Sequence, residues 1–190
     1  MATYEARRSL MEGPSTYELS GDALVRTVGG ATKQQAALAD VRAVKINYQP
    51  VGVVPFWICQ VRTHHGTISI PSANFTGFGR AQDQRAAFRP FVQALTSAIA
   101  AQPRTPPVVF TRGGGGMRLF WLVMVILFAV MTLLLLLGAI GSLISRGTPT
   151  WVVTPAFVML IAGPMSWRMW RANPPGSFDP NALPADIAGG

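Results

Sequence analysis

The chain has 190 residues, of which 49% are hydrophobic and only 13% are charged, and its formal net charge is +8. Soluble globular domains contain about 25% charged residues, so this composition argues against an ordinary soluble enzyme. The apolar excess is concentrated in one part of the chain, because residues 119–167 contain a single charged side chain, Arg146. We therefore expect one soluble domain followed by one membrane segment.

The first hundred residues have the pattern of a small antiparallel β-structure. Short alternating segments are separated by turn residues, and Val44, Ile46 and Tyr48 alternate with polar side chains in the period-two pattern of a half-buried strand. Two apolar segments flank His64-His65-Gly66, which is typical of a hairpin turn. The pattern predicts about six strands in a meander over the domain, with residues 72–82 as a loop.

A helix is expected over residues 83–101, where apolar residues recur at three–four spacing. The stripe consists of Phe88, Phe91, Val92, Leu95, Ala98 and Ile99. Asp83 is a candidate cap, and Pro90 predicts either a kink or a later start of the helix. We expect the stripe to cover the open face of the sheet. In this reading residues 1–14 are an N-terminal extension, residues 15–102 the domain and residues 103–118 a Pro/Gly/Arg linker.

Two apolar segments follow the linker and predict a helical hairpin in a membrane. Residues 119–145 contain no charged side chain and would form a helix of roughly 40 Å, longer than the roughly 30 Å hydrocarbon core. Residues 151–167 contain Pro155 and Pro164 and form a second span, with a re-entrant segment as the alternative. Residues 146–150 connect them as a periplasmic loop.

Basic residues near the ends of these segments predict the orientation. The candidates on the domain side are Arg104, Arg112 and Arg118 before the first segment and Arg168 and Arg171 after the second. By the positive-inside rule, both termini lie in the cytoplasm, and these arginines attract anionic lipid. Tryptophans also stand at the expected span ends, as headgroup-level anchors or as side chains that face a partner. They are Trp121, Trp151, Trp167 and Trp170.

Small residues form a candidate helix-packing patch near the end of the first segment. The patch consists of Gly138, Gly141, Ser142 and Ser145. Small side chains let another helix approach closely, and the partner is either the second segment or another protein.

The tail, residues 168–190, is rich in proline and cannot form a long helix. One interpretation is a disordered cytoplasmic end. The other is a docking peptide in which Phe178 and Leu183 insert into a neighbour or into the chain's own domain.

A meander of about six or seven strands followed by one amphipathic helix resembles the pleckstrin-homology-like (PH-like) superfold. The order of domain, linker, two-helix hairpin and short tail is similar to that of uncharacterised bacterial inner-membrane proteins with a PH-like domain. The resemblance implies an α+β fold, a small β-barrel or roll capped by the helix, with a different β-sandwich as the alternative. PH-like domains bind phosphoinositides through a basic first strand–strand loop. We assign that loop to Gly21-Asp22, which disfavours such binding.

Few residues suggest chemistry. His64 and His65 have no Cys or carboxylate at ligand spacing, and Cys59 lies in an apolar segment typical of a buried side chain. The Gly113–Gly116 segment lacks the residues of a phosphate loop and is interpreted as a linker. We expect no catalytic residues, cofactor, metal, nucleic acid or small-molecule substrate. The N-terminus lacks the apolar segment of a signal peptide, so we expect none to be cleaved.

The sequence thus favours a non-enzymatic, multi-pass protein of the bacterial inner membrane. The leading hypothesis is an accessory or scaffolding subunit of a larger complex, such as a respiratory or photosynthetic one, with lipids and other integral membrane proteins as partners. The alternative is a membrane-anchored regulatory sensor whose domain binds a peptide or lipid at the cytoplasmic face. An enzyme or transporter is a third hypothesis, which requires convergent polar groups in a pocket.

Overall fold

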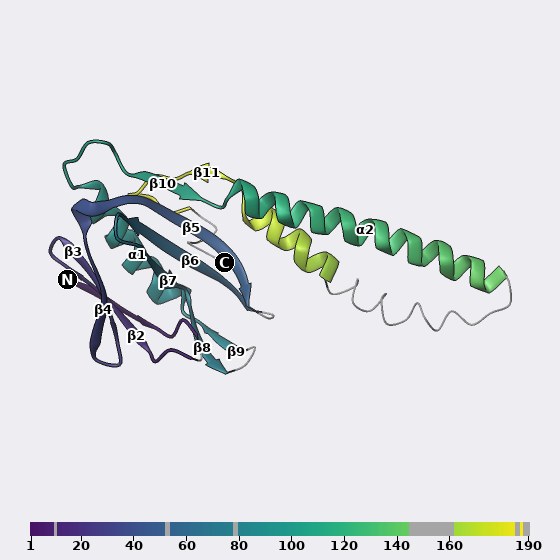
Figure 1. Cartoon of the computed structure of the whole chain (residues 1–190), viewed down its shortest axis with the longest axis horizontal. Coiled ribbons are helices and arrows are strands. Elements are labelled where there is room, and N and C mark those ends of the chain that lie inside the picture. The colour runs from purple at the N-terminus through teal and green to yellow at the C-terminus, as the bar shows by residue number, and fades with distance from the viewer. Residues whose placement is uncertain (10, 52–53, 78–79, 145–161, 185–186, 188–190) are drawn as a thin grey trace. The chain divides into compact units, whose positions relative to one another are not determined.

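The computed structural model describes residues 1–9, 11–51, 54–77, 80–144, 162–184 and 187. The chain divides into two compact units, which are Met1–Gly113 together with Pro175–Gly190, and Gly114–Pro174. The first unit has the expected α+β fold with mainly antiparallel strands (Figure 1). Its described strands form three separate sheets, so the expected closed barrel is absent from this part of the chain.

The first sheet is a four-stranded antiparallel meander. Its strands are β1 (Ala2–Ala6), β2 (Ser15–Ser20), β3 (Ala23–Val28) and β4 (Ala31–Ala37). The turn between β3 and β4 consists of Gly29 and Gly30, which have φ angles of 58° and 83°. Two-residue hairpin turns with positive φ at both positions suit glycine because any side chain there is strained. The expected turn at Gly21-Asp22 is present between β2 and β3.

The second sheet has five strands in the order β11-β10-β5-β6-β7. The strands are β5 (Val41–Val51), β6 (Val54–Thr63), β7 (Thr67–Pro71), β10 (Val109–Arg112) and β11 (Gly176–Ser177). The expected hairpin turn at residues 64–66 joins β6 to β7, and the Thr63 amide donates to the Gly66 carbonyl at 2.9 Å. β10 pairs with β5 in parallel, and β11 pairs with β10 in antiparallel orientation.

Two tyrosine hydroxyls from the first sheet donate hydrogen bonds to backbone carbonyls on the free edge of β7. Tyr4 donates to the Pro71 carbonyl at 2.7 Å, and Tyr17 donates to the Ser69 carbonyl at 2.8 Å. Both side chains are buried, and burial raises the pKa of each phenol above its ordinary value, so each stays a hydrogen-bond donor. These bonds join the two sheets and leave the β7 edge without carbonyls for an added strand at these two positions.

A 16-residue helix, α1 (Arg85–Ala100), covers the core as expected. Five residues of the predicted stripe are buried, namely Phe88, Phe91, Val92, Leu95 and Ile99. The Tyr4 ring lies 6.0 Å from the Phe88 ring and 5.6 Å from the Phe91 ring, so β1 is part of the core. The helix begins after Gln84, which occupies the N-cap position without a side-chain bond, and Asp83 precedes it. The Asp83 carboxylate accepts bonds from the amide and guanidinium of Arg85.

Several expected boundaries are corrected by the structure. Residues 2–6 form a strand of the sheet, so residues 1–14 are not simply an extension. A third, two-stranded sheet of β8 (Ala73–Gly77) and β9 (Arg80–Asp83) replaces the expected loop at residues 72–82. Four linker residues form β10, and two tail residues form β11. The alternation of these segments was too short or too polar to identify them as strands.

The second unit contains a long helix and, near its C-terminal end, a shorter helical segment. α2 (Gly115–Ile144) includes one stretch, Arg118–Gly141, that is long and apolar enough to cross a membrane, with a mean hydropathy of 3.0. Residues 162–172 are helical. The expected loop at 146–150 and most of the second span at 151–167 lie outside the described residues, so the structure does not establish the two-helix hairpin.

Candidate functional site

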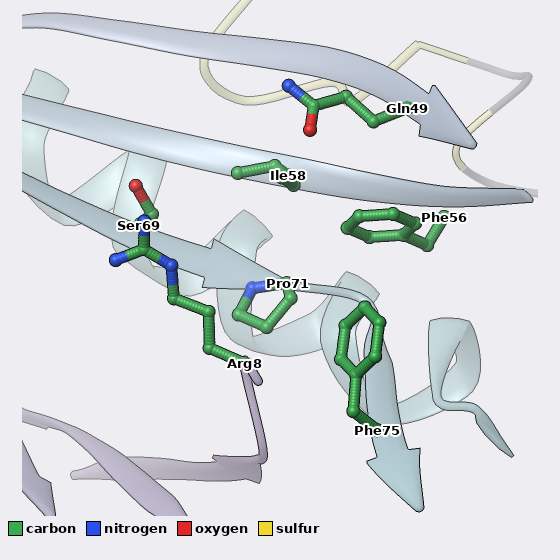
Figure 2. Close-up of a pocket in the computed structure, with 7 residues that line it drawn as sticks. All are labelled: Arg8, Gln49, Phe56, Ile58, Ser69, Pro71 and Phe75. Atoms are coloured by element: carbon green, nitrogen blue, oxygen red, sulfur yellow. The ribbon is translucent and has the colours of Figure 1, made fainter. Parts of the chain in front are cut away.

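A pocket of about 340 Å³ opens on the outer face of the five-stranded sheet. Side chains alternate between the two faces of a strand. On β6, Trp57, Cys59 and Val61 are buried in the core, so Phe56 and Ile58 lie on the other face. That second face lines the pocket. Figure 2 shows the residues that surround it.

One end of the pocket is apolar. It is lined by Phe56 and Ile58 from β6, Pro71 from β7 and Phe75 from β8. The rings of Phe56 and Phe75 meet edge to face, with centroids 5.7 Å apart. Phe56 is only 4% exposed although it lies on the outer face. The β8 strand therefore converts part of an open sheet surface into a partly enclosed site.

The other end is polar and carries a positive charge. It is lined by Arg8 and Ser69, whereas Gln49, the third polar residue of the lining, pairs with Phe56 across β5 and β6. Figure 2 shows the Arg8 guanidinium beside Ser69, with the rings of Phe56 and Phe75 beyond Pro71. Arg8 is exposed, and neither of the two ion pairs found among the described residues involves it. This guanidinium is thus available to an anion that enters the pocket.

The backbone that carries Arg8 is held in place by its neighbour. The Arg7 amide donates to the Asn74 side chain at 3.0 Å, and the Arg7 carbonyl accepts from the Phe75 amide at 3.1 Å. The Arg7 guanidinium donates to the carbonyls of Ser9 and Glu12. These bonds fix the start of the β1–β2 loop against β8, so Arg8 is positioned before any ligand arrives.

An ion pair between the buried Arg26 and the exposed Glu12 secures the far end of the same loop. Arg26 on β3 is 4% exposed and donates to the Glu12 carboxylate at 2.7 Å. Arg26 also donates to the Ser15 hydroxyl at 3.2 Å, and its guanidinium lies 6.0 Å from the centre of the Tyr17 ring. The first strand–strand loop of the domain is therefore residues 7–14, which include Arg7 and Arg8. Our assignment of that loop to Gly21-Asp22 was wrong because β1 was missed.

The tail docks on the chain's own domain. The Phe178 ring packs against the Phe110 ring of β10, with centroids 5.7 Å apart. On α1, Thr96 donates to the Pro180 carbonyl at 2.7 Å, and Gln93 donates to the same oxygen at 3.1 Å. Leu183 contributes its amide, which donates to the Gln93 side chain at 3.1 Å. Further along the tail, Ile187 is buried.

Two of the expected tryptophan anchors lie in the described end of the second unit. The Trp167 and Trp170 rings are tilted against each other with centroids 4.9 Å apart, and the Arg118 guanidinium lies 5.1 Å from the Trp170 ring centre. The start of α2 therefore lies next to the end of the 162–172 helix. Arg168 and Arg171 are exposed, and the Trp121 ring nitrogen is buried without a hydrogen-bond partner in the described residues. Trp151 lies outside these residues.

The small-residue patch is described only in part. Gly138, Gly141 and Ser142 lie in α2, and Ser145 lies outside the described residues. A Cβ atom added at Gly141 would meet no atom of the described chain within 4 Å.

One of the arginines that we assigned to the lipid surface, Arg104, binds within the domain itself. Arg104 donates to the backbone carbonyls of Val41 at 2.6 Å, Leu38 at 2.7 Å and Ile99 at 3.0 Å. One guanidinium thus joins the end of α1 to the start of β5. Arg112 is the last residue of β10 rather than part of a linker. Sequence reasoning missed the Arg104 contacts to Leu38 and Val41 because they join residues more than 60 positions apart.

The remaining candidates occupy ordinary structural positions. The His64 ring contacts the Arg42 guanidinium at the exposed hairpin. Among the described residues, no group of three His, Cys, Asp or Glu side chains could hold a metal ion. Cys59 is fully buried in the core, and burial raises the pKa of its thiol from 9.0 to about 12. A thiol held protonated in this way is a poor nucleophile.

The Cys59 thiol makes the domain less stable in alkaline solution. The unfolded chain releases this proton near pH 9.0, whereas the folded chain holds it to about pH 12, so stability falls as the pH rises between these values. We expect a loss of about 1.4 kcal/mol from this group by about pH 10. This loss in the free energy of unfolding is measured by unfolding the full-length protein in urea. A protease that digests only the unfolded domain reports the unfolded fraction. The C59A variant should lose correspondingly less, and an equal loss in both proteins would contradict this account.

No protein-family model, curated protein or solved structure matches the chain.

Proposed function

We propose that the chain is a two-pass integral protein of the bacterial inner membrane, with its domain and both termini on the cytoplasmic side. Support comes from the way the membrane segment joins the domain. α2 begins three residues after β10 ends. β11 begins four residues after the end of the helical segment 162–172. Because β10 and β11 are hydrogen-bonded neighbours, the chain leaves and re-enters one sheet. A segment with both ends in one sheet crosses a membrane an even number of times.

The proposed role is that of a non-enzymatic accessory or scaffolding subunit in a larger membrane complex, such as a respiratory or photosynthetic one. The observation that carries it is the pairing of β11 with β10, reinforced by the bonds from Gln93 and Thr96 to the tail. Two short connections join the domain to the apolar segment, which suits a domain that serves a membrane neighbour. The apolar span, 6% buried within the chain, needs lipid or partner helices around it.

Extraction of the full-length protein into polymer-bounded native nanodiscs tests this role. We expect an integral membrane protein to remain bound at fixed stoichiometry through size-exclusion chromatography, as read by native mass spectrometry. A variant with the tail released should retain less of that partner, whereas a surface change such as K33Q should retain all of it. A particle that contains only this chain and lipid in both variants would overturn the proposal.

The second candidate function is a membrane-anchored sensor. The pocket at Arg8 favours it, because a preformed apolar cavity with a few placed polar groups is the usual form of a ligand site. This function requires a ligand, and a scaffold does not. Binding of a defined ligand to the pocket therefore separates the two candidates.

A further inference from the structure

We infer that the pocket at Arg8 binds an aliphatic carboxylate of medium length, a molecule of the fatty-acid class. This inference rests on the sensor function and names its ligand. The guanidinium of Arg8 receives the carboxylate, and the apolar end formed by Phe56 and Phe75 receives the hydrocarbon chain. The pocket is polar at one end and apolar at the other, which matches the two ends of such a molecule.

The single positive charge of the pocket favours a ligand with one carboxylate group. Its lining includes one arginine, no lysine and no carboxylate. A guanidinium presents two parallel N–H groups that match the two oxygens of a carboxylate. Phosphate sites use several cations or a row of backbone amides, and here the backbone of β6 is already paired with β5 and β7. A carboxylate therefore fits this site better than a phosphate does.

The same pairing disfavours a peptide. A bound peptide brings an amide and a carbonyl at every residue, and extended peptides usually satisfy them at a free strand edge. The nearest edge, β7, already has its Ser69 and Pro71 carbonyls bonded to Tyr17 and Tyr4. A hydrocarbon chain has no such groups to satisfy, so it enters the pocket without this cost.

The size of the cavity sets the length of the ligand. If each non-hydrogen atom takes roughly the 30 Å³ share of a water molecule, a volume of about 340 Å³ holds on the order of ten atoms. Decanoate has about this size, so we choose it as the probe. A longer chain leaves its end outside the pocket.

Photolabelling of the full-length protein in phosphatidylcholine nanodiscs tests the inference. The probe is a decanoate analogue with a diazirine near the end of its chain, and the labelled peptides are mapped by mass spectrometry. We expect adducts on the β6 and β8 peptides that contain Phe56 and Phe75. Excess decanoate should compete at least tenfold better than decanol or decylamine, because only the carboxylate pairs with Arg8.

Matched variants identify the residue that selects the head group. R8E should lower the labelling yield at least tenfold, and R8K should give an intermediate yield because an ammonium lacks the two-pronged geometry. The control R62E changes a charge on the same face of β6 outside the pocket lining, and it should change the yield less than twofold. Thermal unfolding of each variant verifies that the domain is folded.

Three results would overturn the inference. Adducts confined to α2 would mean that the probe labels only from the lipid, and equal competition by decanol would remove the role of the carboxylate. Stronger competition by a short peptide that ends in leucine would exclude the fatty-acid class and leave the sensor function standing. The ligand and the proposed function are therefore tested separately.

Discussion

Replacing Arg104 with methionine is expected to lower the free energy of unfolding of the domain by about 3–5 kcal/mol. The guanidinium donates to three backbone carbonyls, and hydrogen bonds to a charged group contribute roughly 1.5–3 kcal/mol each. Methionine keeps much of the hydrocarbon stem but removes all three bonds, and the Leu38 and Ile99 carbonyls then keep only their backbone donors. The loss should appear as a lower urea midpoint when the unfolded domain of the full-length protein is digested by a protease.

Two further variants separate the geometry of Arg104 from its charge. R104K should recover less than half of the loss, because a single ammonium group cannot reach the Leu38, Val41 and Ile99 carbonyls in the same arrangement. R62M removes an exposed arginine from β6 and should change the midpoint little. If R104M were no less stable than R62M, the three carbonyl bonds would not hold the domain together.

Releasing the tail from α1 is the second large effect that we expect. The Q93L/T96V double variant removes three hydrogen bonds to the tail, two to the Pro180 carbonyl and one from the Leu183 amide. At about 1 kcal/mol each, with a further cost for polar groups left unpaired, docking should weaken by about 2–4 kcal/mol. Hydrogen exchange at the tail amides should become roughly 30- to 1000-fold faster.

The control for tail release lies at the other end of the same helix. R85Q removes a partly exposed ion pair with Asp83 and makes none of the tail contacts, so tail exchange should be unchanged. Exchange in β2 and β3 should also be unchanged in the double variant, because these strands belong to the other sheet. Unaltered tail exchange in Q93L/T96V would show that the bonds to Gln93 and Thr96 do not hold the tail.

Elements with long periodic patterns could be predicted from the sequence. The α1 stripe and the β6–β7 hairpin occur at the expected positions, because an apolar period of three to four or two residues reports directly on burial. In β5, the expected inward residues Val44, Ile46 and Tyr48 are all buried. Here local preference and tertiary packing agree.

Elements that depend on distant partners could not be predicted. β10 and β11 are four and two residues long and exist as strands through pairing with segments far away in the sequence. β1 contributes Tyr4 to the core, although its neighbours Thr3 and Glu5 are exposed and its pattern is short. Strand pairing and burial of this kind are set by the whole fold rather than by the segment itself.

The pocket was missed for the same reason. Its residues come from the β1–β2 loop and from β5, β6, β7 and β8, and no two of them form a recognisable motif. Of the pocket residues, only Arg8 could have been noticed in the sequence, as a basic residue near the N-terminus. Once β1 is recognised, that residue falls in the first strand–strand loop of the domain.

The side of the membrane on which three single-cysteine variants react tests the central claim most directly. In a C59A background, K33C marks the domain, A182C marks the tail and T148C marks the connection between the two apolar segments. A membrane-impermeant maleimide is applied to sealed vesicles of known orientation. We predict that Lys33→Cys and Ala182→Cys react from one side and Thr148→Cys from the other. Reaction of Ala182→Cys from the side opposite Lys33→Cys, or of Thr148→Cys from the same side, would contradict a two-pass segment closed by β10 and β11.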